Sequence, residues 1–226
     1  MRCRRHTPSS FKALRVQKGE DIFISDGEGG RYITTVDQIT KGGIVLKIKE
    51  TLTKQKREER KIKITLACAI PKFTSFEDIV DKGTQLGIDE IIPLLTQRTL
   101  IKREVFERKM GQLKRVMTTA ARQSGALFLP DLKDPMSFDD LLKVIHQFEL
   151  CLLPNLSDKA FDLKDAVAPF KKGRLLVMIG PEGDFTRREI DLAFKAGCRG
   201  ISLGESVLRV DTAAIAVMSF LRLYLE

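Results

Sequence analysis

The fold is decided by the stretch from Leu175 to Ala216, which reads LLVMIGPEGDFTRREIDLAFKAGCRGISLGESVLRVDTAAIA. It contains two short apolar runs, Leu175–Ile179 and Ile201–Leu203, with the composition of strands that are buried on both faces. Each run is followed by a glycine-bearing turn and then by the start of a helix. Strands that alternate with helices in this way predict an α/β fold with a parallel sheet.

Both helices of this stretch have recognisable starts. Thr186, followed three residues later by Glu189, forms a capping-box pattern that predicts a helix over Arg187–Ala196. A second helix begins near Asp211 or Thr212 and continues to the end of the sequence. Its apolar side chains lie on more than one face, which fits burial against a second subunit or, alternatively, packing within its own domain.

The turns after the two runs are suited to ligand binding. GPEG occupies residues 180–183, and Gly204 opens the second turn. Glycine-bearing loops at the carboxyl ends of neighbouring parallel strands form a crevice in which backbone can approach a ligand closely. Arg209 stands where the second loop meets a helix start, a position suited to a phosphate or a reacting anion. Short glycine motifs of this kind also occur as ordinary turns.

In combination, IGPEGDFT (179–186) and SLGESVLRVDTAA (202–214) resemble the two C-terminal signatures of the ribosomal RNA small-subunit methyltransferase E family, within the SPOUT superfamily. The resemblance implies an α/β domain in which a trefoil knot holds S-adenosylmethionine. The cofactor-binding residues that we expect follow three strand ends. They are Leu153, Ile179, Gly180, Pro181, Glu182, Gly183, Leu203, Gly204, Val207 and Leu208.

The reaction that the resemblance implies is methylation of N3 of a uridine in small-subunit (16S) ribosomal RNA, either as RNA or in the assembled small subunit. The main task of the protein is then to position the acceptor atom in line with the methyl group. Arg209 is the catalytic candidate, because a guanidinium beside the base oxygens would stabilise the anion left when the imide proton departs. Glu182 is a candidate for a general base or for a contact to the cofactor ribose. The family also forms homodimers, with the cofactor pocket near the interface.

Residues 1–65 are predicted to form a separate small β domain. They carry sixteen Lys and Arg against eight Asp and Glu, so most of the net charge of +9 lies in this part. Strand patterns at 21–25, 31–36 and 44–49 are separated by glycine turns, which suggests a small barrel. Its beginning resembles the PUA-like RNA-binding domain of the same family, and Arg15 is the candidate for a phosphate contact.

Residues 66–226 are predicted to form the knotted methyltransferase domain. DKGTQLGIDEIIPLLTQRT (81–99) resembles a phrase of the family in which a lysine-bearing helix leads to a Leu-Gly turn and a strand. On that basis Lys82 and Arg98 are placed near RNA, although either could equally be a surface charge.

A long helix predicted over residues 104–124 ends in Arg122, Gln123 and Ser124. In the family these positions usually hold Glu-Gln-Ser at the edge of the active site, and here they are candidates for RNA contacts. Arg122 in place of the glutamate is a departure. Further departures are Asp184 in place of a glycine, Glu205-Ser206 in place of Pro-Arg, and Gln85 in place of a glutamate.

Several classes of protein are disfavoured by composition. No apolar run approaches the roughly 18 residues of a membrane span, and the basic start lacks the apolar segment of a secretory signal. The four cysteines are widely spaced and there are only two histidines, so neither a metal site nor a disulfide framework is indicated. A G-x-G-x-x-G dinucleotide fingerprint is absent from the sequence. We therefore expect a cytoplasmic protein with reduced cysteines.

Two alternatives to this function stay open at the level of sequence. A related SPOUT enzyme that methylates another RNA would bind the same cofactor and modify a different nucleotide. A non-catalytic RNA-binding protein of ribosome assembly would bind RNA without methyl transfer.

Overall fold

The structure is a computed structural model that describes residues 16–40, 43–155 and 160–225. It divides into two compact units, residues 1–59 and 60–226. The expected domain boundary between residues 65 and 66 would cut strand β4 (Ile62–Ala69) in two. The whole of β4 belongs to the second unit, because it pairs with strands of that unit on both of its sides.

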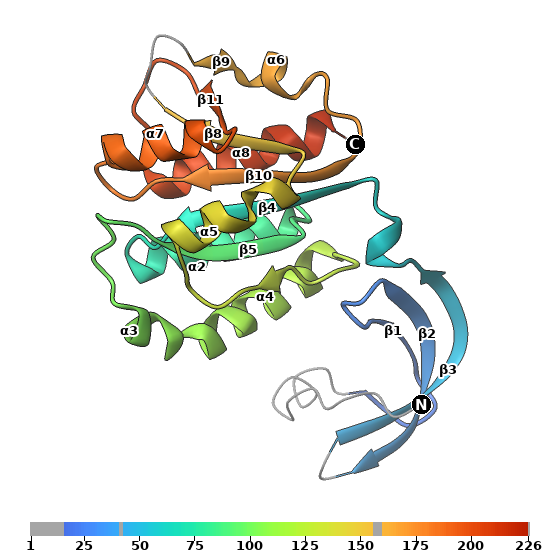
Figure 1. The fold of residues 1–226 in the computed structure, drawn as a ribbon. Coiled ribbons are helices and arrows are strands. Elements are labelled where there is room, and N and C mark those ends of the chain that lie inside the picture. Colours follow the sequence, from blue (N-terminus) through green and yellow to red (C-terminus); the bar gives the residue numbers. More distant parts are fainter. Residues whose placement is uncertain (1–15, 41–42, 156–159, 226) are drawn as a thin grey trace. The chain divides into compact units, whose positions relative to one another are not determined.

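The first unit contains a three-stranded antiparallel sheet in the order β1-β2-β3 (Figure 1). Its strands are β1 (Asp21–Ser25), β2 (Gly30–Thr40) and β3 (Gly43–Lys54). Oδ1 of Asp26 accepts the backbone N–H of Glu28 at 2.8 Å and that of Gly30 at 2.9 Å, which closes the predicted turn between β1 and β2. The strands predicted for this unit are present. The PUA-like barrel stays a prediction, and Arg15 lies outside the described residues.

The second unit is built on a sheet with the order β6-β5-β4-β10-β8-β11-β9, to which β7 adds by pairing with β5. Every pairing found in it among the described residues is parallel. Besides β4, its strands are β5 (Glu90–Leu95), β6 (Asp131–Leu132), β7 (Met136–Ser137), β8 (Leu150–Pro154), β9 (Phe161–Asp162), β10 (Gly173–Ile179) and β11 (Arg199–Ser202). The α/β class with a parallel sheet is thereby confirmed, whereas the trefoil knot stays a prediction.

Helices cover both faces of this sheet (Figure 1). Side chains from α2, α4, α6 and α8 join one core, and those from α5 and α7 join the other. The helices are α2 (Phe73–Gln85), α3 (Arg103–Glu107), α4 (Met110–Ser124), α5 (Phe138–Val144), α6 (Leu163–Val167), α7 (Arg187–Lys195) and α8 (Val210–Tyr224), with a short 3-10 turn at Ile145–Gln147; another 3-10 turn, Arg57–Glu59, belongs to the first unit. Strand β10 shows the alternation directly, since Val177 belongs to the first core and Met178 to the second.

The helix predicted over residues 104–124 is in fact two helices, α3 and α4. The chain breaks at Lys109, whose N–H donates to the carbonyl of Phe106 at 2.8 Å. The ring of Phe106 packs edge-on against that of Phe76, with ring centroids 5.0 Å apart, and is fully buried. The chain therefore turns between α3 and α4 directly beside a fully buried ring.

Helix α8 packs one face within its own unit. Ala214, Val217, Met218 and Leu221 are buried against α2 and the sheet, in agreement with the second of the two interpretations of its apolar faces. Leu223 and Tyr224 near its end are exposed. A homodimer therefore stays a prediction.

Within the described ranges, no helix is long and apolar enough to cross a membrane. Over the same ranges, no group of three or more His, Cys, Asp or Glu side chains could hold a metal ion. The cysteines at 68, 151 and 198 are free and buried.

Candidate active site

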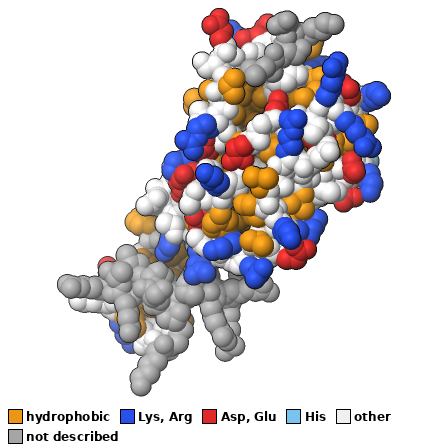
Figure 2. Space-filling view, turned by 90° about the vertical axis from the view of Figure 1, so that its left-hand side faces the viewer, with side chains coloured by type: hydrophobic (Ala, Val, Ile, Leu, Met, Phe, Trp, Pro, Cys, Tyr) orange, Lys and Arg blue, Asp and Glu red, His pale blue; other side chains and the backbone are white. Residues whose placement is uncertain are grey.

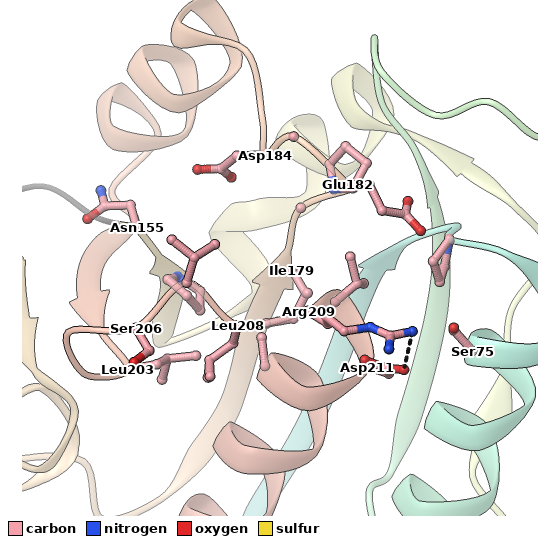
Figure 3. A pocket seen from close by; sticks show the side chains of 18 of the residues that line it. Ser75, Asn155, Ile179, Glu182, Asp184, Leu203, Ser206, Leu208, Arg209 and Asp211 are labelled. Carbon is pink, nitrogen blue, oxygen red and sulfur yellow. Dashed lines mark ion pairs between the residues drawn. The ribbon is translucent and has the colours of Figure 1, made fainter.

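A pocket of about 400 Å³ lies at the carboxyl ends of β8, β10 and β11, beside the segment that follows β4 (Figure 3). The first strand–helix–strand unit leads from β4 to β5 on one side, whereas β10 lies on the other side of β4. The strand order therefore reverses at β4, and this is where open parallel sheets bind ligands. The lining residues are Pro71, Ser75, Pro154, Asn155, Ile179, Gly180, Pro181, Glu182, Gly183, Asp184, Leu203, Gly204, Ser206, Val207, Leu208, Arg209, Val210, Asp211 and Ala213.

The loop after β10 forms one wall of the pocket. A Cβ atom on Gly180 would lie 2.8 Å from Oδ1 of Asp184 and 3.1 Å from the backbone nitrogen of Phe185, so the loop leaves no room for a side chain there. Gly183 has φ +89°, a value that favours glycine. The loop ends in the predicted capping box, in which Thr186 and Glu189 each accept the other's backbone N–H.

Asp184 is the departure from the family pattern that the structure explains. Its φ of +65° makes it the one non-glycine residue with positive φ within the described ranges. Aspartate tolerates this left-handed conformation better than most residues. Its Oδ1 also accepts the N–H of Phe185 at 2.7 Å, which offsets part of the strain.

We expect Asp184→Ala to lower the free energy of unfolding by about 1–2 kcal/mol, because alanine loses the hydrogen bond and pays the left-handed strain. The free energy of unfolding of Asp184→Gly should be within about 0.5 kcal/mol of that of the wild type, since glycine removes the strain. Urea unfolding of both variants measures the difference. An alanine variant as stable as the glycine variant would show that the backbone conformation carries no cost.

The loop after β11 forms the opposite wall. Gly204 has φ +106°, and its N–H donates to Oγ of Ser202 at 3.2 Å. Arg209 is the N-cap residue of α8, and its side chain is 81% exposed. Its guanidinium lies 3.9 Å from Oδ2 of Asp211 and points across the pocket opening toward Ser75 (Figure 3).

Two carboxylates line the pocket together with Arg209. They belong to Glu182 and Asp211. Burial, together with the charges of these two carboxylates, raises the pKa of the Cys68 thiol far above its ordinary value. Cys68 therefore stays protonated.

Nine of the ten residues predicted to bind the cofactor line this pocket, and so does Arg209. Leu153 does not. Its side chain is fully buried in the core beneath α5 and α7, and the next two residues, Pro154 and Asn155, reach the pocket instead. The prediction ended β8 at Leu153, one residue too early. Because neighbouring residues in a strand face opposite sides of the sheet, this shift of one residue separates the buried Leu153 from Pro154, which reaches the pocket.

Sequence reasoning missed Ser75, Asn155 and Asp211, which also line the pocket. Ser75 lies in the first turn of α2, directly after β4, and Asp211 lies in the first turn of α8. Their common signal is a polar residue just after a strand end or at a helix start. That signal identifies a site only when the strands concerned are known to be neighbours.

The residues expected to contact RNA are dispersed. Lys82 lies seven residues beyond Ser75 on α2, about 10 Å along the helix axis, and pairs with Asp81 at 2.5 Å. Arg98 lies in the turn after β5, and its guanidinium donates to the backbone carbonyls of Gly183 and Asp184.

Arg122, Gln123 and Ser124 end α4, from which the chain continues to β6, and β6 pairs with the first residues of β5. They therefore lie at the amino edge of the sheet, opposite to the pocket of the same chain. The RNA contacts expected of these residues stay a prediction; within a single chain, α4 runs antiparallel to the strands over about 22 Å and carries them away from this pocket.

Comparison with known proteins identifies the chain. A model of the RNA methyltransferase domain family matches residues 58–222. Ribosomal RNA small subunit methyltransferase E of Synechocystis is 31% identical over 220 residues, which cover 95% of this chain and 70% of that protein. The protein of that name from Rickettsia conorii is 29% identical over 93% of this chain and 83% of its own length.

Solved structures agree with this comparison. A methyltransferase from Legionella pneumophila, in complex with the cofactor S-adenosylmethionine, is 30% identical with a TM-score of 0.82 over 93% of this chain and 86% of its own. A ribosomal RNA small subunit methyltransferase E from Neisseria gonorrhoeae, 23% identical with a TM-score of 0.78 over 95% of this chain and 87% of its own, shares the fold. The fold and the family model thus define an RNA methyltransferase. Within that class, the chain belongs to the ribosomal RNA small subunit methyltransferase E family.

Proposed function

We propose that this protein binds S-adenosylmethionine in the pocket and transfers its methyl group to N3 of a uridine in small-subunit ribosomal RNA. The observation that carries the proposal is the pocket at the reversal of the strand order, walled by two glycine loops, with the Arg209 guanidinium at its opening.

The lining fits the chemistry of S-adenosylmethionine. Ile179, Leu203 and Leu208 offer apolar surface for a flat adenine ring. Glu182 and Asp211 offer carboxylates to a ligand that carries a sulfonium and an ammonium group. The volume lies within the range of pockets that take ligands of this size. The bound cofactor of the Legionella relative supports the same assignment.

S-adenosylmethionine supplies a methyl group that is bonded to a sulfonium sulfur. The bond between that sulfur and the methyl carbon breaks as the bond between the methyl carbon and uridine N3 forms. The N3 proton leaves, so that the products are N3-methyluridine, S-adenosylhomocysteine and a proton. As that proton departs, negative charge develops on the two carbonyl oxygens of the base. We assign the stabilisation of that charge to the guanidinium of Arg209, which is exposed at the pocket opening.

Basic side chains at helix starts support an RNA substrate. Lys72, Lys102 and Arg209 are the N-cap residues of α2, α3 and α8, and Arg187 and Arg188 open α7. Cations at helix N-termini oppose the helix dipole, so these positions are unfavourable for the helices alone and favourable beside a phosphate. Figure 2, which views the molecule from the left-hand side of Figure 1, shows Lys and Arg side chains spread among Asp, Glu and exposed hydrophobic ones.

The proposal is tested by methyl transfer from labelled S-adenosylmethionine to small ribosomal subunits that lack the modification, and to the RNA extracted from them. We expect label on one uridine, at N3, as identified by nucleoside mass spectrometry. Label on a transfer RNA or large-subunit RNA instead would favour the related enzyme of different target. Binding of small-subunit RNA with no transfer to any RNA would favour the assembly factor.

A further inference from the structure

The turn that follows β5, residues Thr96–Thr99, is closed by its own side chains. The N–H of Thr99 donates to the carbonyl of Thr96 at 3.2 Å, and the N–H of Thr96 donates to Oγ1 of Thr99 at 2.9 Å. The two threonine hydroxyls are also 2.9 Å apart. Three hydrogen bonds within four residues leave this turn little conformational freedom.

The turn is attached to the start of α7 by a buried carboxylate. Oε1 of Glu189 accepts the N–H of Gln97 at 2.9 Å. Oε2 accepts the N–H and the hydroxyl of Thr186, each at 2.8 Å. Glu189 is only 7% exposed, so this one group joins the turn after β5 to the end of the pocket loop over a sequence separation of 92 residues.

Arg98 extends from the same turn to the pocket loop itself. Its guanidinium donates to the carbonyl oxygen of Gly183 and, at 3.3 Å, to that of Asp184. These are the two residues of the loop that have positive φ. Arg98 does not line the pocket. The contact therefore acts on the side of the loop that faces away from the pocket. It is made to the two residues whose left-handed backbone conformation is the least favourable in the loop.

We propose that Arg98 is a positioning residue, which holds the 180–184 loop in the conformation that accepts S-adenosylmethionine, and is not a ligand for RNA. The inference rests on the proposed function of the pocket. Both hydrogen bonds come from one guanidinium nitrogen, Nη1, so a single charged donor group holds the two neighbouring carbonyls. The rigid turn and the Glu189 attachment fix the base from which Arg98 reaches the loop.

The test measures S-adenosylmethionine affinity by calorimetry and affinity for small-subunit RNA by filter binding, for the wild type and for Arg98→Ala, Arg98→Lys and Arg115→Ala. We expect Arg98→Ala to raise the Kd for S-adenosylmethionine about tenfold, as for the loss of one charge-assisted hydrogen bond, with RNA affinity unchanged. The Kd of the Arg98→Lys variant for S-adenosylmethionine should lie between those of the wild type and of Arg98→Ala. Arg115→Ala is the matched control, because the Nε of this exposed arginine donates to Gly111 within its own helix.

Hydrogen exchange gives a second readout that does not need the cofactor. The amides of Asp184 and Phe185 donate within the loop, to the Pro181 carbonyl and to Oδ1 of Asp184. They should exchange faster in Arg98→Ala, while amides of β10 keep their rates.

Each outcome decides the matter. A wild type that does not bind S-adenosylmethionine would overturn the proposed function and this inference with it. A wild type that binds, with an Arg98→Ala variant of equal affinity and equal loop exchange, overturns the inference alone. Reduced RNA affinity with unchanged cofactor affinity would make Arg98 an RNA ligand and also overturn it.

Discussion

Arg209→Ala is expected to reduce the rate of methyl transfer at saturating substrates by about 100- to 1000-fold, the range found when one donor to a developing oxyanion is removed. The side chain is 81% exposed and packs in neither core, so its removal leaves the fold and the loops in place. Affinity for S-adenosylmethionine should change little, because the carboxylates and apolar side chains of the pocket stay in place.

Single-turnover methyl transfer to unmodified small subunits measures this effect, with Arg209→Lys beside Arg209→Ala. Lysine keeps the charge but loses the planar pair of donors, so an intermediate rate is expected. Arg108→Ala is a suitable control, since this exposed arginine donates from Nε to the Glu104 carbonyl at 3.1 Å and lies outside the pocket. An unimpaired Arg209→Ala variant would remove Arg209 from the mechanism, and a rise in KM alone would assign it to RNA binding.

Glu189→Gln is expected to lower the free energy of unfolding by about 2–3 kcal/mol, although it changes one atom of the side chain. Both carboxylate oxygens accept hydrogen bonds, from Gln97 on one side and from Thr186 on the other. The glutamine amide has one oxygen and one NH₂ group, so one of the two acceptors becomes a donor. That NH₂ group would face the backbone N–H of either Gln97 or Thr186. A buried donor is then left without an acceptor, which costs about 1–3 kcal/mol, and part of the helix cap is lost as well.

Urea unfolding followed by circular dichroism measures this change, because the chain has no tryptophan to serve as a fluorescence probe. Asp191→Asn is the matched control, an exposed carboxylate on the same helix. It should stay within about 0.5 kcal/mol of the wild type, as surface substitutions usually do. If Glu189→Gln were as stable as Asp191→Asn, the attachment between the turn and α7 would contribute nothing to stability.

The sequence alone determined the local structure of the site. The capping box of Thr186 and Glu189, the apolar run that becomes β10 and the glycines of both loops were all recognisable, because each depends on interactions within a few residues. Together with the resemblance to the family, they located the pocket loops and Arg209. The parallel sheet followed from the alternation of strands and helices, a pattern that also depends on nearest neighbours along the chain.

Only the tertiary structure decided which side chains meet. Leu153 was assigned to the pocket, but a shift of one residue at the end of β8 turns it into the core. Ser75 and Asp211 lie in the pocket because the strand order places β4 beside β10. The tertiary structure also brings Arg98 onto the pocket loop and places Arg122 at the opposite edge of the sheet. These positions depend on contacts between residues far apart in the chain, such as Gln97 with Glu189, and on the direction in which each element crosses the sheet. Local residue preferences determine neither these long-range contacts nor the direction of each element.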